Sequence, residues 1–368
     1  MKPLGIYIHV PFCRYKCPYC DFYSVTSKDD LLDRFTDETV RRISELAGQN
    51  ISADTVYFGG GTPSLLGGGR IVRIMDALHG SVDIAGDAEI TVEANPSGDI
   101  GTFLEGCASS GVNRLSLGMQ SAVKAELSAI GRRHTPDDVL RTMEQSHSVG
   151  IHNISLDLML GIPFQTADSL EGSLRFIERA EPSHISAYML KIEENTPFRR
   201  IQYALKIADG DQLADMYEQT FDRLEKAGYS QYEISNASKP GCESRHNLKY
   251  WNCDEYIAFG PSAHGFFGGK RYYFDRSLES YLAGAVPHDD GDGGDMEEYV
   301  MLRMRLSEGL TEKGMKVRFG KGIPNALREK ASSPVISPYL ICDDCGIRLT
   351  RKGMLVSNAI ICELTELL

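Results

Sequence analysis

Six apolar segments of strand length alternate with amphipathic segments of helical period over residues 1–235. The strand candidates are residues 4–10, 53–58, 88–93, 112–117, 152–160 and 183–190. The helix candidates are residues 29–48, 68–80, 100–110, 121–148, 167–180 and 209–228. Alternating units of this kind predict an α/β fold with a parallel sheet and helices outside it, either an open doubly wound sheet or a partial barrel.

The remainder of the chain has a different character. Residues 236–286 are rich in Asn, Gly, His and aromatic side chains, and we expect irregular structure there. The acidic, glycine-rich residues 287–295 predict a solvated linker. A helix and shorter elements from residue 296 onward predict a small α+β module that is winged-helix-like. We therefore expect three parts: residues 1–235, residues 236–288 and residues 289–368.

Composition excludes several classes of protein. The chain of 368 residues has a formal net charge of −12, which argues against a general nucleic-acid binder. No apolar run reaches the roughly 20 residues of a membrane span, and no signal peptide is evident, so we expect a cytoplasmic protein. The odd count of 9 cysteines in that compartment argues against a disulfide framework.

Three cysteines cluster directly after the first predicted strand. Cys13, Cys17 and Cys20 have the spacing C-x3-C-x2-C. Three thiolates hold three irons of a [4Fe–4S] cluster and leave the fourth iron open to a small molecule, such as the amino and carboxylate groups of S-adenosylmethionine (SAM). A structural zinc ion would need four ligands, and no fourth Cys or His follows nearby. The motif therefore predicts a [4Fe–4S] site.

Glycine or polar residues also recur where successive strands end. Gly60, Gly61 and Thr62 follow the second predicted strand, and Glu93 ends the third. Gln120 and Asp157 lie on the next two. Any one of them has an ordinary explanation as a turn residue or a helix cap. Their recurrence favours one shared site, because the carboxyl ends of parallel strands meet at one edge of a sheet.

The cysteine motif and its position resemble the radical SAM superfamily, and the further motifs resemble its oxygen-independent coproporphyrinogen III oxidase branch over most of the chain. The resemblance implies a partial (βα)6 barrel that binds a [4Fe–4S] cluster and SAM. It implies contacts with the cluster-bound SAM from Tyr7, Tyr19, Gly60 and Glu93. Gly61, Thr62, Gln120, Arg132 and Asp157 correspond to a second SAM site in the oxidases, although Arg133 stands next to Arg132. No catalytic residue is assigned.

Three features point within that branch to the sister family of heme chaperones, HemW. The oxidases carry a long segment before the cluster motif, whereas Cys13 is the thirteenth residue here. They also carry a fourth cysteine at the position of Phe22. Residues 246–251 contain H-N-x-x-Y-W, a HemW signature in which His246 would ligate heme iron and Arg245 or Lys249 would meet a propionate. On chemistry alone, His246 is a satisfied structural histidine.

The resemblance thus implies a heme chaperone that delivers heme to an acceptor protein, which we expect at the membrane surface. A reductant such as flavodoxin or ferredoxin would serve the cluster. The alternative is oxidative decarboxylation of coproporphyrinogen III. Cys342 and Cys345 would suit a metal site, but they lack a second ligand pair nearby.

Overall fold

The computed structural model describes residues 2–26, 28–96 and 98–368. In these ranges a curved sheet of 12 strands has the order β14-β13-β12-β11-β1-β4-β5-β6-β7-β8-β10-β9. Its parallel centre is β1 (Leu4–Val10), β4 (Ser52–Gly60), β5 (Asp83–Ala94), β6 (Arg114–Gln120), β7 (Asn153–Leu160) and β8 (His184–Met189). These are the six predicted strands, and the partial (βα)6 barrel is confirmed.

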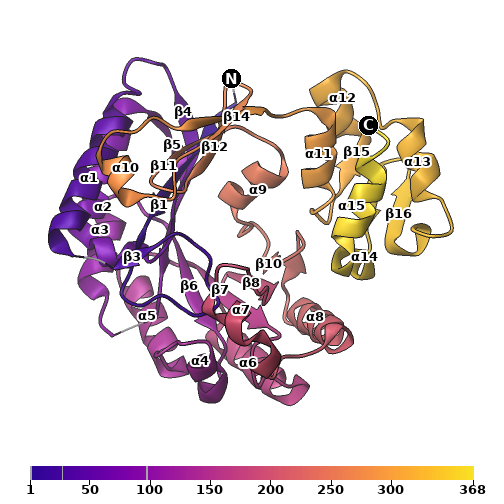
Figure 1. Cartoon of the computed structure of the whole chain (residues 1–368), viewed down its shortest axis with the longest axis horizontal. Coiled ribbons are helices and arrows are strands. Elements are labelled where there is room, and N and C mark those ends of the chain that lie inside the picture. Colours follow the sequence, from indigo (N-terminus) through magenta and orange to yellow (C-terminus); the bar gives the residue numbers. More distant parts are fainter. Residues whose placement is uncertain (1, 27, 97) are drawn as a thin grey trace.

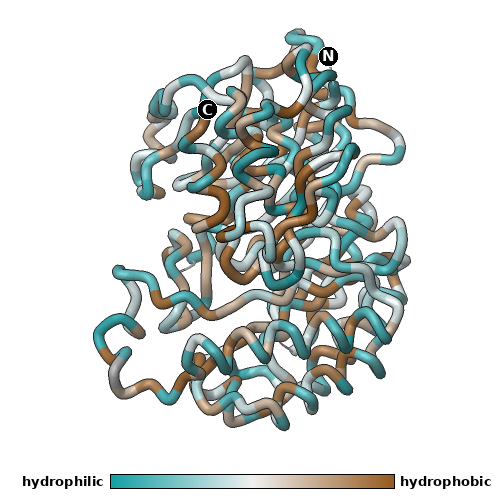
Figure 2. Tube along the Cα trace, turned by 90° about the vertical axis from the view of Figure 1, so that its right-hand side faces the viewer, coloured by the Kyte–Doolittle hydropathy of each residue, from teal (hydrophilic) through white to brown (hydrophobic). Residues whose placement is uncertain are grey.

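Amphipathic helices cover the outside of the parallel strands (Figure 1). They are α1 (Asp29–Ser44), α2 (Gly68–Ser81), α3 (Gly101–Ser109), α4 (Lys124–Ala129), α5 (Pro136–Ser148), α6 (Ala167–Ala180) and α8 (Gly210–Lys226). The short helix α7 (Pro197–Ile201) instead lies against the cysteine loop, where Phe198 N–H donates to Pro18 O at 3.0 Å. Figure 2 shows hydrophobic and hydrophilic residues alternating along the outer helices, as expected when one face packs on a sheet.

The prediction of one helix over residues 121–148 is wrong. The segment forms α4 and α5, separated by a loop in which Gly131 has a φ of 76°. Thr135 then caps α5 in a reciprocal pair of hydrogen bonds with Asp138, and Pro136 occupies the first turn. These local signals end one helix and start another.

The prediction of irregular structure at residues 236–286 is also wrong. The segment contributes β10 (Asn236–Ser238), α9 (Arg245–Trp251), β11 (Tyr256–Phe259), β12 (His264–Phe267), β13 (Lys270–Tyr273) and α10 (Leu278–Leu282). The strands have only three or four residues each, too few to show a clear period. The predicted linker contains an exposed edge strand, β14 (His288–Asp292). Because the sheet continues across residue 235, the three-part division stays a prediction.

The C-terminal segment forms a small α+β unit beside α8 and α9 (Figure 1). Its elements are α11 (Met296–Arg303), β15 (Leu310–Thr311), α12 (Glu312–Phe319), α13 (Asn325–Ala331), β16 (Leu340–Asp343), β17 (Gly346–Leu349), α14 (Arg351–Leu355) and α15 (Ser357–Thr365). The order helix, strand, two helices and hairpin fits the predicted winged-helix-like module. Its apolar side chains join the main hydrophobic core.

Two short strands, β2 (Phe12–Cys13) and β3 (Val25–Thr26), frame the cysteine loop, and β9 (Ser230–Gln231) ends the sheet at the far edge. Among the described residues, no helix is both long and apolar enough to cross a membrane.

Candidate functional site

A cavity of about 840 Å³ lies inside the curved sheet. Its lining comes from the cysteine loop at one side, from the inward faces of β1 and β4 to β8, and from α9 and the β11–β12 region. Pockets of about 300–1,000 Å³ suit cofactor-sized ligands. The cavity therefore joins, in one space, the two motifs that the sequence singles out.

The three cysteines lie on one loop, at the mouth of this cavity. Cys13 ends β2, and Cys17 and Cys20 follow in the loop; all three are half-buried free thiols. Cys20 lines the cavity, and burial raises the pKa of its thiol. No three His, Cys, Asp or Glu side chains in the described ranges converge as the ligands of one metal ion do. A cubane instead takes each thiolate at a different iron, which suits three separated cysteines on one loop.

A chain of hydrogen bonds ties this loop to the ends of the strands. The Thr62 hydroxyl lies 3.6 Å from Cys13 Sγ and accepts a hydrogen bond of 3.0 Å from Asn95 Nδ2. Arg132 donates to Asn95 Oδ1 and, through Nη2 at 2.9 Å, to the Tyr19 hydroxyl. The network holds Tyr19, Thr62 and Arg132 around the cysteine loop.

The structure also separates Arg132 from its neighbour. Arg132 points inward to this network, whereas the exposed Arg133 lies over the ring of Tyr15, with 3.9 Å between the guanidinium carbon and the ring centroid. Arg132 is therefore the arginine that belongs to the candidate site.

The glycine segment after β4 brings two backbones into close contact. Gly61 N–H donates to Val10 O at 2.9 Å, and a Cβ on Gly61 would lie 2.7 Å from that oxygen. Gly60 has a φ of 104°, and a Cβ there would meet the His9 ring at 2.4 Å. A larger residue would therefore collide at either position. Both glycines are explained by packing, and their predicted SAM contacts stay predictions.

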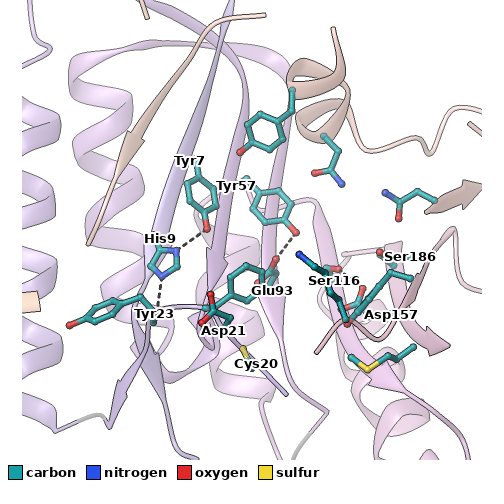
Figure 3. Close-up of a pocket in the computed structure, with 18 of the residues that line it drawn as sticks. Tyr7, His9, Cys20, Asp21, Tyr23, Tyr57, Glu93, Ser116, Asp157 and Ser186 are labelled. Atoms are coloured by element: carbon teal, nitrogen blue, oxygen red, sulfur yellow. Dashed lines mark hydrogen bonds between the residues drawn. The ribbon is translucent and has the colours of Figure 1, made fainter. Parts of the chain in front are cut away.

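Glu93 is the half-buried carboxyl group near the end of β5. Its Oε1 accepts from the Tyr57 hydroxyl at 2.7 Å (Figure 3). Its Oε2 accepts from Gly60 N–H at 3.1 Å. Burial raises the pKa of Glu93, and these two hydrogen bonds act in the opposite direction. The side chain lines the cavity and is held in one orientation, as a contact for a cationic amino group requires.

Asp157 lines the same cavity from β7. Burial, and then the nearby Glu93, raise the pKa of Asp157 to about 7.

Gln120, at the end of β6, has a φ of 66° and accepts a hydrogen bond of 2.8 Å from the Tyr188 hydroxyl. A strained backbone held by the surrounding structure is common at ligand sites.

Tyr7 also lines the cavity, and a histidine beside it orients its ring. The Tyr7 hydroxyl lies 3.0 Å from His9 Nδ1, and His9 Nε2 lies 3.0 Å from the Tyr23 carbonyl (Figure 3). Burial lowers the pKa of His9 to about 4. A neutral His9 donates from Nε2 to the Tyr23 carbonyl and accepts at Nδ1 from the Tyr7 hydroxyl. The bond to His9 fixes the orientation of the Tyr7 side chain toward the cavity.

Helix α9 carries the H-N-x-x-Y-W motif against the inner face of β1 and β4. His246 is fully buried: Nδ1 lies 2.8 Å from the Thr55 hydroxyl and Nε2 lies 2.8 Å from the Tyr250 hydroxyl. Burial lowers the pKa of His246 to about 3, so the imidazole is neutral. Asn247 and Tyr250 face the cavity directly. The role of His246 toward heme stays a prediction.

The two cations of the motif point elsewhere. Lys249 Nζ lies 2.6 Å from Asp54 Oδ1 and donates to Pro3 O at 2.9 Å. Arg245 donates to Asp87 O at 2.6 Å. Neither residue lines the cavity.

Several lining residues escaped the sequence analysis, although a signal for them existed. Polar residues alternate along three apolar strands, so that they share the inward face. The missed residues are Arg114 and Ser116 in β6, Ser155 in β7, and His184 and Ser186 in β8; the predicted Asp157 shares the face of Ser155. An alternation of polar residues within a strand expected to be buried on both faces indicates a polar cavity.

Cys342 and Cys345 lie far from this cavity, exposed at the β16–β17 hairpin. They belong to no group of three metal-ligating side chains among the described residues.

The barrel, the cysteine loop and the cavity define a radical SAM protein. The family model described as "Radical SAM superfamily" matches residues 7–177. Coproporphyrinogen III oxidase (HemN) of Escherichia coli, a radical SAM enzyme, has the same fold, with a TM-score of 0.83 at 21% identity over 100% of this chain and 91% of that one.

Relatives of similar length identify the family within that class. The heme chaperone HemW of Escherichia coli is 38% identical over 98% of each chain. HemW of Bacillus subtilis is 33% identical over 96% of this chain and 97% of its own. The chain belongs to the HemW family. Membership implies a [4Fe–4S] cluster and SAM as cofactors, and the three free thiols beside a polar cavity fit both.

Proposed function

We propose that this protein binds heme and delivers it to an acceptor protein. Similarity to HemW chaperones over nearly the whole chain carries the proposal. Two features of the site support it: a cavity large enough for a tetrapyrrole, and α9, which presents Asn247 and Tyr250 of the HemW signature to that cavity.

The proposed iron ligand is His246. Its imidazole is neutral, which is the form that ligates metals. Tyr250 stands between Nε2 and the cavity, since its hydroxyl binds Nε2 and its ring lines the cavity. Rotation of Tyr250 would expose Nε2 while Thr55 keeps hold of Nδ1. Ligands of this kind are oriented by a hydrogen bond to the other ring nitrogen.

The proposed cluster ligands are Cys13, Cys17 and Cys20. Bound there, the cluster would supply an electron to SAM. Tyr7, Tyr19, Glu93 and Asp157 line the cavity at that end and would hold SAM. Gly60, Gly61, Thr62, Gln120 and Arg132 would shape the site through the contacts described above. The protein's own groups thus position SAM and exclude water.

The proposed partners and compartment follow from the surface and the family. Arg14 and Lys16 are exposed on the cysteine loop of an acidic protein, which favours an acidic reductant such as flavodoxin or ferredoxin. We place the protein in the cytoplasm and its heme acceptor at the membrane surface.

We also retain the proposed division of the chain into three parts. These are a radical SAM core of residues 1–235, an extension of residues 236–288 that carries the H-N-x-x-Y-W motif, and a C-terminal module of residues 289–368.

Coproporphyrinogen III oxidation is the second candidate, favoured by the fold of HemN. One anaerobic experiment separates the two. Reconstituted protein is mixed with heme, or with coproporphyrinogen III, SAM and a reductant, and the heme spectrum and porphyrin products are recorded. Tight heme binding without decarboxylated product supports the chaperone. Conversion to protoporphyrinogen supports the oxidase.

His246→Ala should lower heme retention at least about tenfold while the cluster spectrum stays unchanged, because an axial ligand is lost. The control is His79→Ala, on the exposed surface of α2. Heme titration followed by absorbance measures both variants. Equal retention in both would remove His246 as the ligand.

A further inference from the structure

A buried guanidinium that has no hydrogen-bond or ion-pair partner among the described residues faces the cavity. Arg114 begins β6, is 2% exposed and lines the cavity. Its Nε has no hydrogen-bond partner in the described parts of the chain, and no ion pair there joins it to Glu93 or Asp157. A buried, unpaired charge is costly to a folded protein. The unpaired guanidinium of Arg114 lines a cavity, and we infer that a ligand bound in this cavity supplies the anion that pairs with it.

Two carboxyl groups of the cavity, Glu93 and Asp157, lie near enough for the charge of Arg114 to lower the pKa of each, but neither forms a hydrogen bond or an ion pair with Arg114. Glu93 uses both oxygens for Tyr57 and Gly60. Asp157 is a protonated acid for part of the neutral range, because its pKa is raised to about 7. The described residues therefore leave the guanidinium of Arg114 without a directly bound counter-ion.

Arg114 lies at the same level of the barrel as α9. It pairs in register with Thr91 of β5. Two residues earlier on that strand, Glu89 accepts the backbone N–H groups of Arg245 and His246 at the start of α9, each at 3.0 Å. Gln120, a predicted SAM contact, stands at the opposite end of β6, about 20 Å away along an extended strand. Arg114 thus lies toward α9 and away from the carboxyl end of β6.

The surrounding side chains suit a carboxylate. Ser116, Ser155 and Asn247 line the same cavity, and their hydroxyl and amide groups are able to donate hydrogen bonds to a carboxylate. Arginine is the side chain whose planar fork matches a carboxylate with two parallel hydrogen bonds. Arg245 and Lys249, the cations that the sequence suggested for this purpose, are turned away to Asp87 and Asp54.

We propose that Arg114 binds a propionate of the tetrapyrrole held in the cavity and so sets its orientation toward α9. The proposal rests on heme binding as the function of the site. The SAM carboxylate has the same chemistry, and the test must separate the two sources.

The test compares heme with its dimethyl ester, in the same dilute detergent, on the wild-type protein and on Arg114→Gln and Arg114→Lys. Wild type should prefer free heme by at least about tenfold, the scale of one buried charge-assisted hydrogen bond. Arg114→Gln should lose that preference, and Arg114→Lys should regain part of it. The control Arg245→Gln should keep it.

Each contrary result has its own meaning. Equal affinity of the wild type for heme and ester overturns the propionate contact. Loss of SAM affinity in Arg114→Gln, with heme preference intact, assigns the guanidinium to the SAM carboxylate instead. Failure of the wild type to bind heme at all overturns the proposed function, and the propionate contact with it.

Thermal unfolding of the ligand-free protein checks for a purely structural role. Removing an unpaired buried cation should leave the unfolding temperature of Arg114→Gln unchanged or higher. A marked decrease, with heme selectivity retained, would show that Arg114 serves folding only.

Discussion

At the scale of single residues, burial gives the carboxyl groups of the cavity their properties. Glu93 and Asp157 face the cavity from β5 and β7, on either side of β6, and the pKa of each is raised by loss of water. Hydrogen bonds from Tyr57 and Gly60 offset part of that effect for Glu93, whereas Asp157 accepts one hydrogen bond of 3.5 Å, from Ser116. The two carboxyl groups are therefore expected to act differently toward a cationic ligand.

Replacing Glu93 by Gln should weaken SAM binding at least about tenfold without loss of iron, because the negative charge and one of the two acceptor oxygens that would face the SAM amino group are lost. Equilibrium dialysis of SAM against reconstituted protein, with iron determined on the same sample, measures both effects. Glu105→Gln, on the exposed surface of α3, is the matched control. An unchanged SAM affinity would exclude Glu93 from the site.

Asp157 should make the stability of the ligand-free protein depend on pH. Its pKa is about 7 in the folded state against 3.8 ordinarily, so the folded chain holds a proton that the unfolded chain releases. This contribution is complete below the unfolded pKa and is lost as pH rises through the folded one. Thermal unfolding of wild type and Asp157→Asn should therefore diverge as pH rises from about 4 to about 7, with the wild type losing stability relative to the variant. Parallel curves would contradict the raised pKa.

At the scale of elements, α9 depends on a strand far away in sequence. Glu89 of β5 accepts the first two backbone N–H groups of the helix, and Thr55 of β4 binds its histidine. A Cβ on Gly5 would lie 2.9 Å from the Lys249 side chain, so β1 also needs its glycine for α9 to pack. Three core strands thus hold the helix that carries the HemW signature.

Glu89→Gln should lower the free energy of unfolding by about 1–2 kcal/mol, because one acceptor oxygen at a helix N-terminus is replaced by an amide donor. Urea unfolding of this variant beside Glu105→Gln measures the difference. A stability equal to that of the control would show that Glu89 does not hold α9.

At the scale of the whole molecule, the C-terminal module supports the other end of α9. Arg303 of α11 donates to the side chain of Asn252, the residue that ends α9, and to Gly309 O at 3.1 Å. Arg351 of α14 pairs with Asp222 and Glu225 of α8. The apolar residues of the module and barrel form one core. The module is therefore expected to influence the cavity through α9.

Arg303→Ala should lower the free energy of unfolding by about 1–3 kcal/mol. The reason is that the Asn252 side chain, directly after α9, and the Gly309 carbonyl lose their charged donor. The control is Arg348→Ala, whose half-exposed side chain pairs with Asp343 within the module. Chemical unfolding and heme retention are measured together. Full heme retention after such a loss of stability would mean that the module does not position α9.

The sequence alone determined the six βα units, the place of the cysteine loop and the residue types at the strand ends, because each depends on a local period or spacing. It did not show the strands of residues 236–273, which are too short for a period and form only by pairing with the existing sheet. Only the tertiary structure decided that Arg132 rather than Arg133 points inward, and that Arg245 and Lys249 turn from the cavity while Arg114 faces it. Which charge finds a partner depends on side chains that folding brings together from distant parts of the chain, and no local pattern records that.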